Sequence, residues 1–370
     1  MKYTWDLEKL RYRKKLLEEI ARHTDDENTK YNALEQVDIY SDMMKTAKKK
    51  SNSMDELDST LNDLTFDQLV DEVTASYSPR NLKYIDLLLQ SFFKIKDYNF
   101  KEEDDTTLVS TNDELVDLAL DFFDKKTPSY VKKEFINILN QKDIINISYT
   151  KSDTIYAGYT LYDYFLNKKY IFVGRSNKLY DLGILPHEAF HYIFRDKNVG
   201  LVGLYDTYYL TEVEGMFANI LFGEYFRENT SPSNTYFEDY SLSLFKNNIS
   251  DLVTRNTVLD SLKTNKKIRL SKLNKYLGYF EVLPFMTQDE LIPYLTMPEE
   301  NVIKYALSYL TALDLYYIYK KDPEEAFYLL SCITYMKQTN EIITLLKNND
   351  ITFMKDDFKN LKKYVKNRNN

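Results

Sequence analysis

Two histidines with a glutamate between them are the residues best placed for chemistry in this sequence. His187 and His191 lie four positions apart, and Glu188 directly follows the first of them. On an α-helix, residues at this spacing share one face, so the two imidazoles could bind a single metal ion. Zinc suits such a pair, and the glutamate could act as a general base on a water molecule that the ion activates. The pattern indicates hydrolytic chemistry if the segment is helical and a third ligand exists.

The competing interpretation is a chance match, with both histidines serving only as core residues. The chain has three histidines among its 370 residues. Two of so few at metal-binding spacing favour the metal site over coincidence.

A catalytic zinc site needs a third protein ligand and an open coordination position. Three acidic residues downstream are candidates: Asp206, Glu212 and Glu214. Residues 210–223 have an apolar stripe at helical spacing, and Glu212 lies on the same face as Gly215 and Asn219. Glycine on that face lets another helix approach closely. We therefore favour Glu212 as the third ligand over Glu214.

The histidine pair itself requires a helix over residues 181–194. Apolar residues cover much of its circumference, which is typical of a buried helix. Pro186 precedes the pair, and proline is tolerated only in the first turn of a helix. This predicts that the helix begins near Ile184.

The composition predicts a mainly α-helical chain. Glycine and proline, which disfavour helix interiors, number only eight each. Residues 1–140 read as a helical N-terminal lobe of amphipathic segments, with a capping box from Thr111 to Glu114. Residues 141–370 hold the histidine pair and form the predicted catalytic region. The two parts are expected to make one continuous domain.

A short stretch before the histidine pair has the character of a β-sheet. Residues 144–150, 154–160 and 170–174 are rich in β-branched and aromatic side chains, with turn residues between them. We predict a small antiparallel sheet of about three strands beside the histidine helix.

Charge and composition exclude several classes of protein. The formal net charge of −8 argues against a nucleic-acid partner. The single cysteine allows no intrachain disulfide, and no apolar stretch reaches membrane-spanning length. The first residues lack the apolar core of a signal peptide. A cytoplasmic protein that does not bind membranes is expected, with its oligomeric state left open.

Three segments resemble the thimet oligopeptidase and oligoendopeptidase F family of zinc peptidases. Residues 181–191 are similar to the family's helix with the pattern H-E-x-G-H. Residues 212–219 resemble its E-I-A-S-T-F-N-E helix, whose first glutamate is the third zinc ligand and matches Glu212. Residues 305–317 are similar to its tyrosine-rich C-terminal helix.

The resemblance implies a zincin-like helical peptidase that binds one Zn²⁺ through His187, His191 and Glu212. It implies cleavage of internal peptide bonds in oligopeptides, with Glu188 as the general base. In the family a tyrosine hydroxyl donates to the oxyanion, and Tyr309 is the first choice here, with Tyr305 the second.

The sequence also departs from the family pattern. The family's glycine between the histidines is Phe190 here, and its further histidine is Phe194. The chain is shorter than typical members. One alternative is therefore an inactive pseudo-peptidase that acts as a peptide- or protein-binding module. Another is a zinc hydrolase with a non-peptide substrate.

Overall fold

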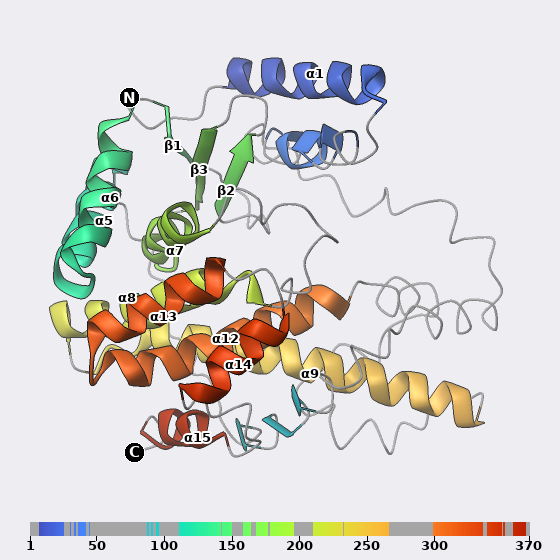
Figure 1. Ribbon diagram of the computed structural model, residues 1–370, viewed down its shortest axis with the longest axis vertical. Coiled ribbons are helices and arrows are strands. Elements are labelled where there is room, and N and C mark those ends of the chain that lie inside the picture. The colour runs from blue at the N-terminus through green and yellow to red at the C-terminus, as the bar shows by residue number, and fades with distance from the viewer. Residues whose placement is uncertain are drawn as a thin grey trace.

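The computed structural model of the chain is mainly α-helical (Figure 1). It describes residues 7–25, 111–141, 143–149, 158–163, 168–176, 178–195, 210–231, 233–265, 299–335, 339–349, 351 and 358–367, together with scattered positions in 30–44 and 87–95. Asp206 and the first half of the predicted strand 154–160 lie outside the described residues. The boundary at residue 140 between the two predicted lobes stays a prediction.

Helices supply most of the described structure, and their bounds are as follows. They are α1 (Leu7–His23), α5 (Asn112–Lys126), α6 (Ser129–Asn140), α7 (Asp181–Phe194), α8 (Val213–Asn229), α9 (Tyr236–Asn265), α12 (Glu299–Tyr319), α13 (Pro323–Tyr335), α14 (Thr339–Asn348) and α15 (Lys359–Lys366). None of the helices in the described ranges combines the length and the apolar character needed to cross a membrane.

The described strands form one three-stranded sheet in the order β1-β3-β2. Its strands are β1 (Ile145–Tyr149), β2 (Gly158–Asp163) and β3 (Lys168–Arg175). β2 and β3 are antiparallel, as predicted, but β1 pairs with β3 in parallel, with Ile145 opposite Ile171. The prediction of a wholly antiparallel sheet was therefore wrong, because strand composition does not report the direction in which the chain re-enters a sheet.

Placing β3 at the centre explains its apolar sequence. Its last six residues are all buried. A strand with neighbours on both edges and packing on its faces reads as a continuous apolar run rather than an alternating one. β3 is thus a rigid platform for the helix that follows it.

The N-terminus of α7 is anchored to the end of β3. The buried carboxylate of Asp181 accepts hydrogen bonds from the backbone N–H of Ser176 at 2.8 Å and of Lys178 at 3.2 Å. The helix consequently begins at Asp181, not near Ile184 as predicted, and Pro186 lies inside it. The first turn closes through hydrogen bonds between residues three apart, such as the one from the Gly183 N–H to the Tyr180 carbonyl. Pro186 lies beyond this turn, and because it has no N–H it cannot donate the backbone hydrogen bond expected there.

The C-terminus of α7 is anchored to the start of the same strand. Nζ of Lys169 donates to the carbonyl oxygen of Tyr192 at 2.7 Å and to that of Arg195 at 2.5 Å. Carbonyls at a helix C-terminus lack partners within the helix and attract cations. Both ends of α7 are therefore fixed to β3.

The two phenylalanines that depart from the family pattern belong to an aromatic core behind α7. Phe190 is fully buried, and its ring lies 5.6 Å from that of Phe123 on α5 and 6.0 Å from that of Phe327 on α13. Phe194 also packs against Phe327, with ring centroids 6.0 Å apart. Large side chains thus fix the rear of the histidine helix against two neighbouring helices.

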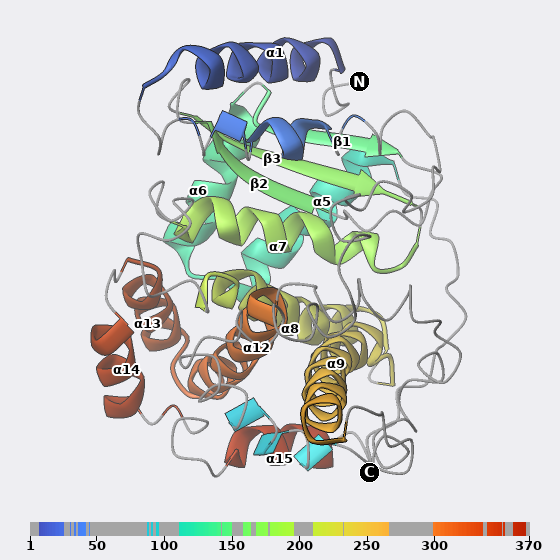
Figure 2. The ribbon, with the colours of Figure 1, turned by 90° about the vertical axis from the view of Figure 1, so that its right-hand side faces the viewer.

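The elements stack in layers (Figure 2). α1 lies on one side of the sheet and α7 on the other, and α8 follows beneath α7 with α9 and α12. α8 packs against α7, α9 and α12. α7 is therefore enclosed between the sheet and α8. The predicted capping box from Thr111 to Glu114 is confirmed at the start of α5.

Candidate metal centre

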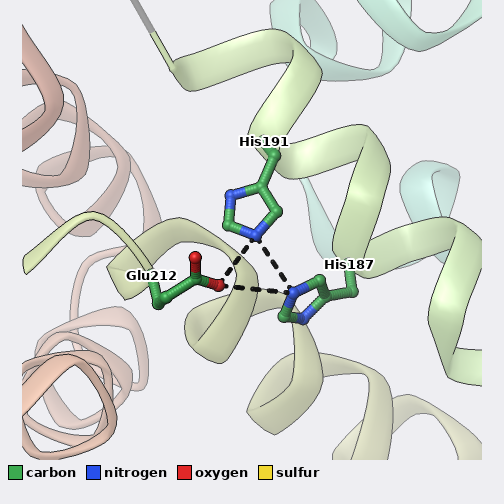
Figure 3. A group of neighbouring side chains, drawn as sticks. All are labelled: His187, His191 and Glu212. Atoms are coloured by element: carbon green, nitrogen blue, oxygen red, sulfur yellow. Dashed lines mark hydrogen bonds and ion pairs between the residues drawn. The ribbon is translucent and has the colours of Figure 1, made fainter. Parts of the chain in front are cut away.

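His187, His191 and Glu212 point toward one common centre (Figure 3). The two Nε2 atoms lie 3.0 Å apart. Oε2 of Glu212 is 3.2 Å from Nε2 of His191 and 3.9 Å from Nε2 of His187. The two histidines come from α7, and Glu212 stands immediately before α8.

These separations match the donor set of a zinc ion. Ligand atoms about 2.0–2.1 Å from one tetrahedral zinc ion are about 3.3 Å from one another. Two neutral imidazoles and a carboxylate are also a ligand set found in catalytic zinc sites, which keep a fourth position open. The residues present therefore fit a zinc ion.

Gly215 leaves the space that such an ion would need. A Cβ atom added at this position would lie 2.5 Å from Nε2 of His187 and 2.7 Å from Nε2 of His191. A side chain here would thus intrude between the two nitrogen atoms. The absence of a Cβ on the first turn of α8 keeps the centre of the three ligand atoms accessible.

Each histidine is oriented through its other ring nitrogen. Nδ1 of His187 lies 3.2 Å from Oδ1 of Asn219, and Nδ1 of His191 lies 2.9 Å from Oε1 of Glu214. Both partners can accept a hydrogen bond from Nδ1–H, which leaves Nε2 as the metal-binding atom. Outer partners of this kind hold the imidazole orientation in metal sites.

Glu212 is positioned outside the helix that follows it. It is the N-cap residue of α8, and its side chain makes no capping bond to the helix. Its backbone N–H donates to Oγ of Ser308 on α12 at 3.3 Å. The predicted start of this helix at residue 210 was three residues early, so Glu212 precedes the helix instead of lying on one of its faces.

The charges around the ligands are strongly coupled. Burial alone would raise the pKa of Glu212, but His191, Arg195 and Lys304 outweigh it and hold that pKa well below its ordinary value. Burial and Arg195 lower the pKa of His191, but Glu212 and Glu214 together raise it to about 9. These charges favour the carboxylate form of Glu212, which is the form that binds a metal ion.

Glu188 lies under the start of β2. Oγ1 of Thr160 is 2.8 Å from Oε2 of Glu188 and 2.7 Å from its backbone oxygen. A Cβ atom at Gly158 would come within 2.7 Å of Cγ and Oε1 of Glu188, so this strand approaches the glutamate more closely than another residue would permit. The strand predicted beside the histidine helix thus positions the candidate base.

The two candidate tyrosines have different surroundings. Tyr305 is 36% exposed, and the negative charge of Glu212, followed by burial and the charge of Glu188, raises the pKa of its hydroxyl. Tyr309 is buried, and its ring stacks on that of Phe245 at 4.7 Å. The hydroxyl of Tyr305, the second choice from the sequence, therefore senses the charges of Glu212 and Glu188.

Several residues of the site were missed by sequence reasoning. They are Thr160, Arg195, Asn219, Ser308 and Lys304, and Glu214 was considered only as a ligand. Asn219 carried a signal, because it shares the helix face of Glu212. The others come from separate elements or act through atoms that no spacing rule reports.

Comparisons with solved structures show which proteins share the fold that carries this site. PZ peptidase A, solved with an inhibitor, superposes with a TM-score of 0.53 at 14% identity, covering 95% of this chain and 71% of that one. This chain has a peptidase fold. No protein-family model matches the sequence, and no curated protein matches it.

Two further solved structures are similar at lower scores. One is a Bacillus anthracis protein assigned to oligoendopeptidase F, with a TM-score of 0.47, 15% identity, and coverage of 92% of this chain and 65% of that one. The other, also assigned to oligoendopeptidase F, has a TM-score of 0.48 at 13% identity. The superposition on PZ peptidase A confirms the resemblance drawn from the sequence at the level of a mainly helical peptidase fold with a small sheet.

Proposed function

We propose that this chain is a zinc-dependent metallopeptidase that hydrolyses internal peptide bonds of oligopeptides. His187, His191 and Glu212 would hold one zinc ion, and Glu188 would act as the general base. The observation that carries the proposal is the convergence of three ligand atoms within 4.8 Å of one another on a peptidase fold. The anchoring of both Nδ1 atoms supports it further.

The bound ion would supply Lewis acidity toward the scissile carbonyl and toward water. Glu188 would accept a proton from the water molecule as its oxygen attacks the carbonyl carbon. It would return that proton to the amide nitrogen as the C–N bond breaks, which gives a carboxylate and an amine. Thr160 holds the carboxylate of Glu188 in place through a hydrogen bond of 2.8 Å.

Tyr305 is our preferred donor to the carbonyl oxygen, ahead of Tyr309. Negative charge develops on that oxygen during attack, and a fixed hydroxyl donor stabilises it. The Tyr305 hydroxyl is protonated at neutral pH, as a donor must be, and the charge of Glu212 raises its pKa further. Its partial exposure supports access to a substrate, whereas Tyr309 is enclosed against Phe245.

The second candidate is an inactive relative that binds peptides without cutting them. The departures at Phe190 and Phe194 motivated it, but both rings belong to the core behind α7. They therefore face away from the candidate metal centre and give this candidate little support.

We propose a cytoplasmic protein whose partners are peptides and not nucleic acids. The net charge of −8 and the single cysteine support this proposal.

The first prediction tests the general base. Wild type and Glu188→Gln would be compared for zinc content and for cleavage of a mixed peptide pool. We expect both to bind about one zinc ion per chain and the variant to lose roughly 10²–10⁴-fold in kcat/KM, because the amide cannot take up a proton. Glu238→Gln, on α9, serves as a control for replacing a buried glutamate.

The outcomes separate the candidates. Wild type without zinc would overturn the metallopeptidase proposal. Full activity in Glu188→Gln would overturn the assignment of the base. Zinc binding with no cleavage of any peptide would favour the binding module.

A further inference from the structure

An ion pair between the partly exposed Arg195 and the buried Glu214 contacts the candidate ligands His191 and Glu212. Nε of Arg195 donates to Oε1 of Glu214 at 3.0 Å, and the Glu214 side chain is 2% exposed. Arg195 follows α7 and Glu214 lies in the first turn of α8, so the pair joins the two elements that carry the ligands. The E-I-A-S-T-F-N-E pattern has alanine where this chain has Glu214.

Oε1 of Glu214 is shared between the arginine and a ligand. It lies 2.9 Å from Nδ1 of His191. That nitrogen is also 2.7 Å from Nη2 of Arg195, but it cannot accept from Arg195 while it donates to Glu214. When Nε2 of His191 faces a metal ion, the proton sits on Nδ1, and Glu214 is then its acceptor.

The arginine also contacts the other ligand element. Nη2 of Arg195 is 3.4 Å from Oε1 of Glu212 and donates to the carbonyl oxygen of Thr211 at 2.5 Å. Nζ of Lys304 lies 3.4 Å from the same oxygen of Glu212. Two cations thus occupy Oε1, and Oε2 is the oxygen directed at the histidines.

The pair is poorly arranged for stability alone. An isolated arginine–carboxylate pair gains most from two parallel bonds to both oxygens. Here the second oxygen of Glu214 is buried and has no hydrogen-bond partner among the described residues. The guanidinium instead divides its donors among Glu214, Glu212 and Thr211.

We propose that Arg195 and Glu214 are positioning residues for the metal, which together fix His191 and select Oε2 of Glu212 as the donor oxygen. The inference rests on the proposed zinc site. Neither residue would contact the ion or the substrate. Both would act through the ligands, by binding Nδ1 of His191 and Oε1 of Glu212, which face away from the metal position.

The test measures zinc affinity on the full chain by competition with a chromophoric chelator. The variants are Glu214→Leu, Arg195→Met, their double combination, and Glu214→Gln, which keeps an acceptor for His191. Thermal unfolding of the metal-free proteins runs in parallel. Arg227→Met is the matched control, because Arg227 pairs with the buried Glu238 at 3.2 Å far from the ligands along the chain.

Each variant has an expected result. Glu214→Leu and Arg195→Met should bind zinc roughly 10–100-fold more weakly, as for other residues that support metal ligands. Glu214→Gln should retain more of the affinity than Glu214→Leu. The double variant removes both charges together, so its stability should recover relative to the single variants while its zinc affinity stays low. Arg227→Met should bind zinc as wild type does.

Two results would overturn the inference in distinct ways. If the double variant regains wild-type affinity along with stability, the pair only balances charge. If the single variants fold and bind zinc within about threefold of wild type, the pair has no positioning role, although the metal site stands. A wild type that binds no zinc removes the metal site as well, so failure of the proposed function is recognised separately.

Discussion

Each ligand side chain of the candidate centre is held through its own atom on the side away from the metal position. Asn219 holds His187, Glu214 holds His191, and two cations hold Glu212. A side chain fixed at its far atom loses little freedom when the ion arrives, because it is already oriented. The centre is therefore preorganised at the scale of single atoms.

Tyr305 allows a second prediction at this scale. Tyr305→Phe should lower kcat by roughly 10²–10³-fold with little change in KM, because the hydroxyl would act on charge that develops only during reaction. Steady-state kinetics on a peptide found by cleavage profiling would measure both constants. Tyr309→Phe is the paired variant. If it lowers kcat and Tyr305→Phe does not, the first choice drawn from the sequence is the correct one.

The ligands were accessible to sequence reasoning, but their supports were not. The spacing of His187 and His191 and the helix face of Glu212 are local properties, and the structure brings the three together. Arg195 reaches Glu212 from just after α7 and Lys304 from α12, so their role depends on how helices pack. Packing partners distant in sequence leave no periodic signal.

At the scale of elements, the site is a contact between two helices at a glycine. Gly215 lies where α8 meets the imidazoles of α7, and any Cβ there would approach both Nε2 atoms. Helix types and approximate bounds were predictable from periodicity. The parallel pairing of β1 was not, because it depends on long-range strand contacts. The true start of α7 was also missed, because Asp181 accepts local hydrogen bonds from Ser176 and Lys178 that the position of Pro186 does not reveal.

The third prediction concerns this contact. Gly215→Val should weaken zinc binding at least tenfold, because the added carbons enter the space between the two nitrogen atoms. Circular dichroism would check that the helices persist, and chelator competition would measure the affinity. Gly183→Ala on α7 is the control, since the nearest atoms to its Cβ would be ring carbons of Phe222 and Phe237 at 3.3–3.5 Å, not the ligands. Equal affinity in the two variants would contradict the role of Gly215.

At the scale of the whole molecule, the candidate metal centre joins residues of the sheet, α7, α8 and α12. A ligand that binds only the folded state stabilises it by mass action, by about 4 kcal/mol at 1,000 times Kd. The fourth prediction is that zinc raises the Tm of the chelator-treated protein by several degrees. A variant with both His187→Ala and His191→Ala should show no rise. An unchanged Tm for wild type at saturating zinc would contradict the site.

The fixing of α7 at both ends by one strand has a consequence for its rotation. Asp181 is bonded beyond the last residue of β3, and Lys169 near its first residue caps the other end. Each residue turns a helix by about 100°. One residue inserted between Asp181 and His187, with the Asp181 anchor kept, would rotate the two imidazoles together away from Glu212 and draw the carbonyls of Tyr192 and Arg195 away from Lys169. A relative could therefore keep every letter of the motif and still lose the metal, through chain length alone.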